Sequence, residues 1–132
     1  MGQHGDGFLL AFGSAWLAVS CAVVVQRAFA AHGRAYPRDR IHVRIGVHTG
    51  PAIRAGRGFF GKSVVVASRI TAEAKGGEIL ASEPALEAAR AVAPIVSGEP
   101  RTVELRGLRG TYVLHPVVGS KRKPEQLLPA SG

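Results

Sequence analysis

The sequence predicts a single domain of the α/β (α+β) class, and three observations support this prediction. Residues 41–48 alternate apolar and polar side chains, which is the pattern of a half-buried strand. Ser14 precedes a long apolar stretch and is a preferred residue type at the start of a helix. The chain has 132 residues, 46% hydrophobic and 20% charged, so its length and composition are those of one globular domain.

The first half of the chain is predicted to combine strands with one long helix. The helix that begins at Ser14 is apolar on most sides, so a sheet must cover one face and a partner is expected on another. Thr49-Gly50-Pro51 predicts a turn after the alternating segment. The predicted elements are a strand at 7–12, a helix from 14 to about 31, a loop at 32–40, a strand at 41–48 and a returning hairpin strand at 52–54.

Glycine and serine mark the elements of the second half. Gly76-Gly77 is expected to close a helix, and Ser82 followed by Glu83 is typical of the start of another. The folded domain is predicted to cover residues 1–118, and residues 119–132 are predicted to be a disordered basic tail. The predicted elements are a helix at 62–74, a strand at 78–81, a helix at 82–90 and strands at 102–105 and 111–117.

The net charge of +8 raises the question of nucleic-acid binding, since the chain has 17 Lys and Arg residues and only 9 Asp and Glu residues. The arginines are spread singly along the chain, and the basic cluster Lys121-Arg122-Lys123 stands apart in the predicted tail. Aromatic residues are few and do not alternate with the basic ones, as a base-stacking surface would require. We therefore predict a solvated basic surface and no nucleic-acid partner.

Residues 7–26 carry no charge and are long enough to span a bilayer, so a membrane segment or an export signal is an alternative. Basic residues do not precede this stretch, and Gly13-Ser14 interrupts it as a strand-to-helix turn would. We favour a buried strand and a buried helix. Cys21 is the single cysteine, which excludes an internal disulfide; it is predicted to face the core, and the domain is predicted to be cytoplasmic.

Residues 56–63 (Gly-Arg-Gly-Phe-Phe-Gly-Lys-Ser) match the phosphate-loop pattern of nucleotide-binding proteins. In such a loop, backbone N–H groups surround the phosphates, Lys62 would contact them and Ser63 would bind magnesium. Two phenylalanines stand inside the pattern, and no apolar strand ending in Asp follows it. A phosphate-loop nucleotide-binding protein is therefore kept as a third hypothesis, ranked below the two that are given at the end of this section.

A longer set of segments resembles the catalytic domains of class III adenylyl and guanylyl cyclases. The likeness covers residues 5–117, with matching segments in the same order and at similar spacing. These segments are Gly5-Asp6-Gly7-Phe8-Leu9, Gln26-Arg27-Ala28, residues 44–50 (Arg-Ile-Gly-Val-His-Thr-Gly), residues 60–69 (Phe-Gly-Lys-Ser-Val-Val-Val-Ala-Ser-Arg), residues 77–82 and Leu105-Arg106-Gly107-Leu108.

This resemblance implies a ferredoxin-like α/β sandwich of the nucleotide cyclase type. It also implies active sites that form between two domains arranged head to tail, in a homodimer or with another cyclase domain. In the family, two aspartates of one domain hold two Mg²⁺ or Mn²⁺ ions that activate the ribose 3′-hydroxyl of ATP or GTP, and the hydroxyl attacks the α-phosphate. The other domain supplies an asparagine that positions the ribose and an arginine that stabilises charge on the phosphate.

Carried over to this sequence, the family pattern is incomplete. Asp6 matches the second metal-binding aspartate, and Arg69 matches the catalytic arginine. The first aspartate would lie on a strand upstream of Met1, so the fold is expected to lack its first strand. The remaining positions carry other residues: Gly2 and Gly58 stand at the purine-reading positions, Val65 at the ribose asparagine and Leu108 at a phosphate-binding lysine, for which Arg106 or Arg109 could substitute.

These departures predict a cyclase-family domain that is inactive or nearly so, and a chain that is a fragment of a longer gene product. Half of the metal carboxylates and one preorganised donor are missing, so binding of both ions and the reaction rate should fall. The second hypothesis is a degenerate cyclase-like module that serves in dimerisation or regulation. His42 and His48 are predicted to face solvent, with no ligand role.

Overall fold

The structure is a computed structural model that describes residues 14–51, 53–56 and 58–120. Gly2, Asp6 and the strand predicted at 7–12 lie outside the described residues, as does the tail from residue 121. The helices are α1 (Ala15–Ala35), α2 (Lys62–Glu73), α3 (Glu83–Arg90) and the 3₁₀ helix η1 (Pro37–Asp39). The strands are β1 (Ile45–Val47), β2 (Ile53–Ala55), β3 (Gly58–Phe60), β4 (Ile79–Ser82), β5 (Ile95–Ser97), β6 (Arg101–Glu104) and β7 (Thr111–Ser120).

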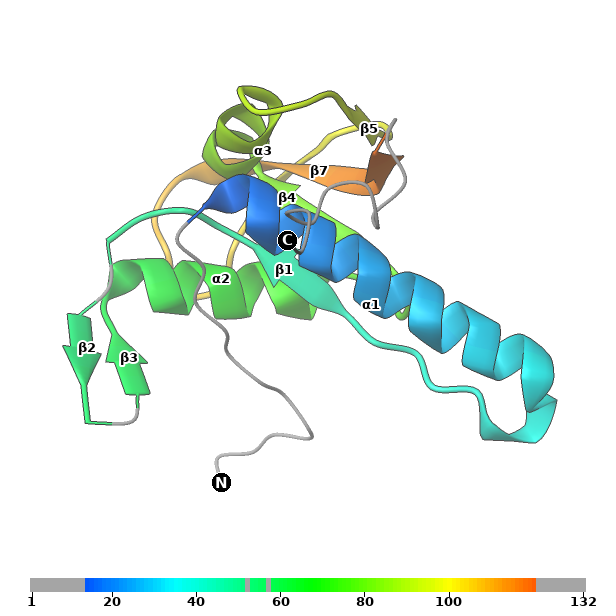
Figure 1. The fold of residues 1–132 in the computed structure, drawn as a ribbon. Coiled ribbons are helices and arrows are strands. Elements are labelled where there is room, and N and C mark those ends of the chain that lie inside the picture. Colours follow the sequence, from blue (N-terminus) through cyan, green and yellow to red (C-terminus); the bar gives the residue numbers. More distant parts are fainter. Residues whose placement is uncertain (1–13, 52, 57, 121–132) are drawn as a thin grey trace.

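The described strands form one mixed sheet and a separate hairpin (Figure 1). The sheet has the order β1-β4-β7-β5, and β6 also pairs with β7. β1 and β4 are parallel, whereas β7 is antiparallel to β4, β5 and β6. A parallel neighbour requires a crossover connection, and α2 provides it between β1 and β4.

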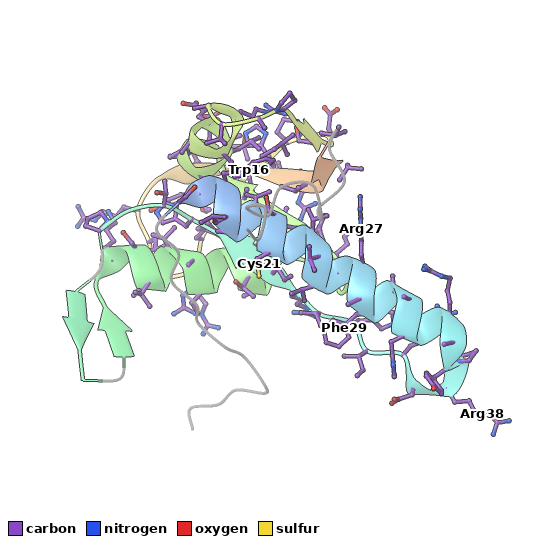
Figure 2. All side chains as sticks on the ribbon, in the orientation of Figure 1. Trp16, Cys21, Arg27, Phe29 and Arg38 are labelled. Atoms are coloured by element: carbon purple, nitrogen blue, oxygen red, sulfur yellow. The ribbon has the colours of Figure 1, made fainter. Side chains whose placement is uncertain are left out.

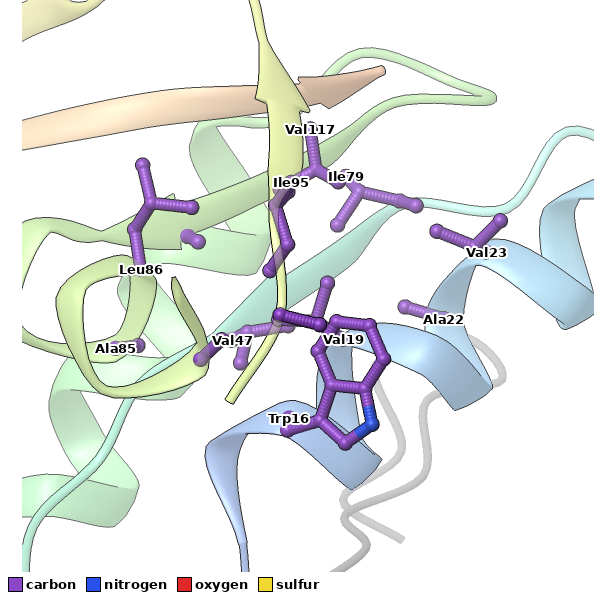
Figure 3. Packing of buried hydrophobic residues seen from close by; sticks show 13 residues of the cluster. Trp16, Val19, Ala22, Val23, Val47, Ile79, Ala85, Leu86, Ile95 and Val117 are labelled. Atoms are coloured by element: carbon purple, nitrogen blue, oxygen red, sulfur yellow. The ribbon is translucent and has the colours of Figure 1, made fainter. Parts of the chain in front are cut away.

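Strand β4 separates two hydrophobic cores. Its residues point alternately to the two faces of the sheet, so Ile79 and Ala81 enter one core and Leu80 enters the other. The first core lies under α1 and α3 (Figure 3) and is formed by Trp16, Val19, Ala22, Val23, Val47, Ile79, Ala81, Ala85, Leu86, Ala89, Ala93, Ile95 and Val117. The second core lies under α2 and is formed by Val66, Ile70, Ala74, Leu80, Leu105 and Leu114.

Helix α1 begins at the predicted residue and ends later in the chain than predicted. The Ser14 hydroxyl accepts hydrogen bonds from the backbone N–H groups of Trp16 and Leu17, so the predicted cap is confirmed. The helix continues to Ala35 and thus takes in part of the segment predicted as a loop. Its N-terminal half packs on the sheet, while its C-terminal half projects beyond the sheet (Figure 1).

Apolar residues remain on the outer surface of α1. Leu17 and Val24 are exposed and Cys21 is half-buried, which differs from the core position predicted for the cysteine (Figure 2). Among the described residues, α1 is long and apolar enough to cross a membrane by length and composition, with a mean hydropathy of 1.3. A helix that covers the core of a soluble domain also has these properties.

The predictions for residues 41–54 need two corrections. The alternating strand is paired only over Ile45–Val47, because the carbonyl of Val43 accepts its hydrogen bonds from the Gln26 side chain and the Gly77 backbone instead of from a strand. The predicted hairpin after Pro51 is wrong, since β2 pairs with β3 and not with the preceding strand. Strand β3, which was not among the predicted elements, forms the second arm of that hairpin.

The second half of the chain follows the prediction more closely. Helices α2 and α3 are confirmed, and the Ser82 hydroxyl caps α3 by accepting a hydrogen bond from the Ala85 backbone. The three-residue strand β5 was not predicted. Strand β7 continues to Ser120, two residues into the segment predicted as a tail.

Gly46 sets the distance between β1 and α2. A Cβ atom at this position would lie 2.5 Å from the Thr71 hydroxyl, 2.6 Å from the Thr71 backbone nitrogen and 3.0 Å from the Ala67 carbonyl oxygen. Two of these atoms belong to the helix backbone, so rotation of a side chain would not relieve the overlap. Glycine therefore allows the strand and the helix to pack this closely.

We predict that Gly46→Ala destabilises the domain by about 1–3 kcal/mol, because the added methyl group must push α2 away from β1. Urea unfolding followed by circular dichroism measures the change in the free energy of unfolding. Gly98→Ala is the matched control, since its Cβ would meet only Pro116 side-chain atoms at 3.7 Å and 3.8 Å. Equal stability of the two variants would contradict the close packing at Gly46.

Candidate functional site

Helix α2 carries two of the predicted site residues on neighbouring turns. Arg69 follows Val65 by four residues, a spacing that places both side chains on the same side of a helix. Val65 is 44% exposed, so an apolar side chain faces solvent at the position where the family resemblance implies asparagine. Arg69 is half-buried, and its Nε atom is buried without a hydrogen-bond partner among the described residues.

The turn between β6 and β7 carries the other cationic candidates. Arg106 and Arg109 are exposed in this turn, where Gly107 and Gly110 adopt φ angles of 79° and 81°. Leu108 lies between the two arginines and packs against the core under α2. Leu108 therefore serves as a packing residue here, and the flanking arginines are the side chains of the turn that remain accessible to an anion.

Three candidates are not brought together with Arg69 by the described structure. Gly58 lies on β3, in the separate hairpin, and the structure does not describe Gly2 or Asp6. Within residues 14–51, 53–56 and 58–120, no three His, Cys, Asp or Glu side chains gather closely enough to hold a metal ion. The fit of a metal ion to this chain thus depends on Asp6, outside the described part.

The phosphate-loop pattern is divided between a strand and a helix. Residues 58–60 pair with β2 as strand β3, whereas a phosphate loop would direct successive backbone N–H groups at one anion. Gly61, with a φ of 124°, then leads into α2, and Lys62 and Ser63 begin that helix. The sequence matches the phosphate-loop motif, but the middle residues of the motif belong to a β-hairpin.

His48 differs from its prediction as a solvent-facing residue. Its Nδ1 atom lies 2.8 Å from the hydroxyl of Ser82, which is itself only 1% exposed. Partial burial disfavours the imidazolium form and lowers the pKa of His48 below its ordinary value of 6.5. Because Ser82 also caps α3, His48 connects the end of β1 to the start of that helix. His42 is exposed, as predicted.

An ion pair that the sequence analysis did not predict joins β6 to the chain before β4. The Arg101 guanidinium donates two hydrogen bonds, of 2.8 Å and 2.9 Å, to the two carboxylate oxygens of Glu78. These hydrogen bonds lower the pKa of Glu78, and the Lys75 backbone N–H adds a further one of 2.9 Å. The partners are 23 residues apart, so no local sequence pattern could have revealed the pair.

Comparison with known proteins gives one family. The sequence model of the family described as "Adenylate and Guanylate cyclase catalytic domain" matches residues 3–116. A curated relative, "Putative adenylate cyclase 3" of Rhizobium meliloti (strain 1021), is 45% identical over 82 residues, which are 61% of this chain. The chain spans only 14% of the length of that relative.

Solved cyclase structures share the fold. The guanylyl cyclase Cya2 superposes with a TM-score of 0.67 at 27% identity, over 80% of this chain and 58% of that one. The adenylyl cyclase CyaB from P. aeruginosa gives a TM-score of 0.67 at 22% identity, over 83% of this chain and 61% of that one. The predicted fold class, a mixed α and β domain of the nucleotide cyclase type, is therefore confirmed.

We predict that acidification from about pH 7 to about pH 5 destabilises the domain partly through His48. Since its folded pKa lies below the unfolded value of 6.5, the unfolded chain binds the proton more readily, and stability is lost as the pH falls below that value. His48→Asn keeps a polar nitrogen near Ser82 but does not titrate, so its melting temperature should fall less over this range. His42→Asn is the exposed control; equal pH dependence in all three proteins would contradict the prediction.

Proposed function

The chain belongs to the adenylate and guanylate cyclase catalytic domain family, and from this membership we propose that it supplies Arg69 to a nucleotide site shared with a second cyclase domain. The substrate class is ATP or GTP, and the second domain is a head-to-tail copy or another cyclase domain. The chain by itself is inactive or nearly so. The proposed location is the cytoplasm, where these nucleotides are available.

The single observation that carries this proposal is that Arg69 Nε is buried without a hydrogen-bond partner in the part of the chain that the structure describes. A guanidinium has five N–H donors, and a buried donor without an acceptor costs free energy. Because Nε is buried while Arg69 as a whole is half-buried, a phosphate oxygen arriving at α2 would accept charge-assisted hydrogen bonds from the terminal N–H groups of the same guanidinium. A donor already in position when negative charge develops on the phosphate stabilises that charge without rearrangement. Arg69 is therefore proposed as the catalytic arginine of the shared site.

Val65 leaves α2 without a side chain that could position the ribose of the nucleotide. Its exposed side chain lies one turn before Arg69 and has no atom that can hydrogen-bond to a ribose hydroxyl. A site that holds the phosphate but not the ribose loses the orientation of the 3′-hydroxyl towards the phosphorus atom. Arg106 and Arg109 are the proposed phosphate contacts from the β6–β7 turn, in place of the packed Leu108.

The family generally uses divalent metal ions, so Mg²⁺ or Mn²⁺ is the expected cofactor. Asp6 is the proposed ligand of this chain. One carboxylate beside the substrate phosphates makes a weaker site than two, since magnesium is held by carboxylates together with substrate oxygens. At the site that receives Arg69, the chain would contribute charge stabilisation, and the carboxylates of the second domain would hold the metal ions; Asp6 would belong to the other site of the pair.

A second function is supported by the exposed apolar residues. Val65 on α2, and Leu17 and Val24 on α1, are large hydrophobic side chains that face solvent. A degenerate module that pairs with a cyclase domain without contributing to chemistry would bury such residues. The two functions differ in whether Arg69 affects the catalytic rate, and that difference can be measured.

We predict that the 132-residue chain alone forms no cyclic AMP or cyclic GMP above the blank from ATP or GTP with Mn²⁺. Missing donors and metal ligands act together, so the expected rate is below detection. The measurement is separation of the products by chromatography, with the guanylyl cyclase Cya2 as the positive control for GTP. Formation of product by the purified chain would contradict the proposed incompleteness of its site.

We also predict that the chain restores activity to a cyclase domain that keeps both metal aspartates but has lost its own catalytic arginine. Val65→Asn should raise the activity of the mixture, because it returns a ribose-positioning group next to Arg69. In that background, Arg69→Ala should lower the rate by about 10²–10³-fold.

Arg27→Ala is the matched control for this experiment, since Arg27 is exposed and lies outside α2. It should leave the rate of the mixture within about twofold. Co-elution of the two domains should be measured for every variant. A complex that forms with Arg69→Ala and retains full activity would exclude a catalytic role for Arg69 and would favour the dimerisation module.

A further inference from the structure

The end of α1 and the segment that follows it form a projecting tip outside both cores. Figure 1 shows the C-terminal half of α1 extending beyond the sheet, with η1 turning the chain back towards β1. Figure 2 places Arg38 at the far end of this projection. We call residues 32–44 the α1 tip. With the exception of Gly33, its residues are exposed or half-buried, so the tip presents most of its side chains to solvent.

The α1 tip is held in one arrangement by its own contacts. His32 Nε2 lies 2.8 Å from the Asp39 carboxylate, and its ring centroid lies 5.0 Å from that of Tyr36. The side chain of Arg40 lies against Gly33, where a Cβ atom would come within 3.2 Å of the arginine Cγ. The returning segment is thus attached to the last turns of α1. A surface that is already ordered loses less conformational entropy when it binds a partner.

The charge of the tip is strongly unbalanced. Four exposed arginines stand within eleven residues, at Arg34, Arg38, Arg40 and Arg44, and none forms an ion pair with a described carboxylate. Asp39 is the one acidic residue of this segment, and it pairs with His32. Arginine guanidinium groups bind carboxylates and phosphates in a planar two-point geometry, so the tip can receive a partner rich in carboxylates.

An apolar hollow lies beside these charges. It has a volume of about 240 Å³ and is lined by Ala28, Phe29, His32 and Ile41. Ile41 is 46% exposed, and Tyr36, on the same tip, is 61% exposed. A concave apolar surface with charged residues around it matches one apolar side chain flanked by charges of opposite sign.

From the fixed shape, the apolar hollow and the arginines that have no ion-pair partner among the described residues, we propose that the α1 tip is a docking site for an acidic protein segment, in which carboxylates contact the arginines and one large apolar side chain enters the hollow. A flat anionic membrane fits less well, because it offers no single anchor for a hollow and would favour apolar side chains that protrude together. The site lies on a different helix from Arg69, so it is independent of the proposed nucleotide chemistry.

The test uses the full chain and a short acetylated and amidated peptide with one central leucine and glutamates on both sides at helical spacing. Fluorescence anisotropy of the labelled peptide should show saturable binding that weakens with added salt. Peptides with glutamine in place of glutamate, or with alanine in place of leucine, should bind at least about 10-fold more weakly.

Variants of the chain locate the binding site. The double variant Arg34→Glu/Arg38→Glu should weaken binding at least about 10-fold, and Ala28→Phe, which fills the hollow, should weaken it without changing charge. Lys62→Glu, a charge reversal at the exposed first residue of α2, is the matched control and should bind within about twofold of the original chain. Circular dichroism establishes that each variant is folded.

Two outcomes would overturn the proposal. The first is absence of saturable peptide binding, or binding that is equal for the leucine and alanine peptides. The second is binding to phosphatidylserine vesicles that depends on Arg34 and Arg38 while the peptide does not bind, which would assign the tip to a membrane surface. Peptide binding that requires both the glutamates and the leucine, and that the tip variants abolish, supports it.

Discussion

The burial of strand β4 on both of its faces is the constraint from which the rest of the arrangement follows. All four of its residues are buried, and Leu80 and Ala81 are completely inaccessible to solvent. A strand covered on both faces is apolar along most of its length, as the run Ile79-Leu80-Ala81 is, and the polar Ser82 at its end is satisfied by hydrogen bonds with His48 and Ala85. Helices α1 and α3 must then lie on one face and α2 on the other, which assigns each helix a buried side and an outer side.

The position of Arg69 is a consequence of this assignment. Val66, Ile70 and Ala74 recur at four-residue spacing on α2 and fix its buried side above Leu80. Val65 and Arg69 each precede one of these residues and therefore lie at the border between the buried side and solvent. There Nε is buried and has no hydrogen-bond partner within residues 14–51, 53–56 and 58–120, so packing in the core decides how the guanidinium is presented.

Local signals in the sequence were sufficient for much of the fold. The caps at Ser14 and Ser82 and the helix of residues 62–73 depend on neighbouring residues only, and the structure agrees with each. Two errors concern strands: β5 is too short to show a period, and the carbonyl of Val43 accepts hydrogen bonds from the Gln26 side chain and the Gly77 backbone instead of from a strand. His48 was also misplaced, since its partner Ser82 lies 34 residues later.

The same distinction between local sequence information and contacts made by the fold applies to the candidate site. The resemblance to cyclases identified Arg69 and the apolar residue at Val65, because residue identity can be read from aligned motifs. It could not reveal that Leu108 packs on the core or that Arg69 Nε is buried with no partner among the residues described, since both depend on the fold around them. Motif positions thus give the candidates, and burial decides which of them can meet a ligand.

The length of α1 is not explained by the stability of the domain. Its first half buries Trp16, Val19, Ala22 and Val23, but the last turns contribute no residue to either core. A helix end that contacts mainly its own return segment gains little from hydrophobic burial, and neighbouring arginines repel one another. A segment that adds little stability and still holds a fixed shape is better explained by a role in binding a partner. The function proposed for the α1 tip is therefore separate from that proposed for α2.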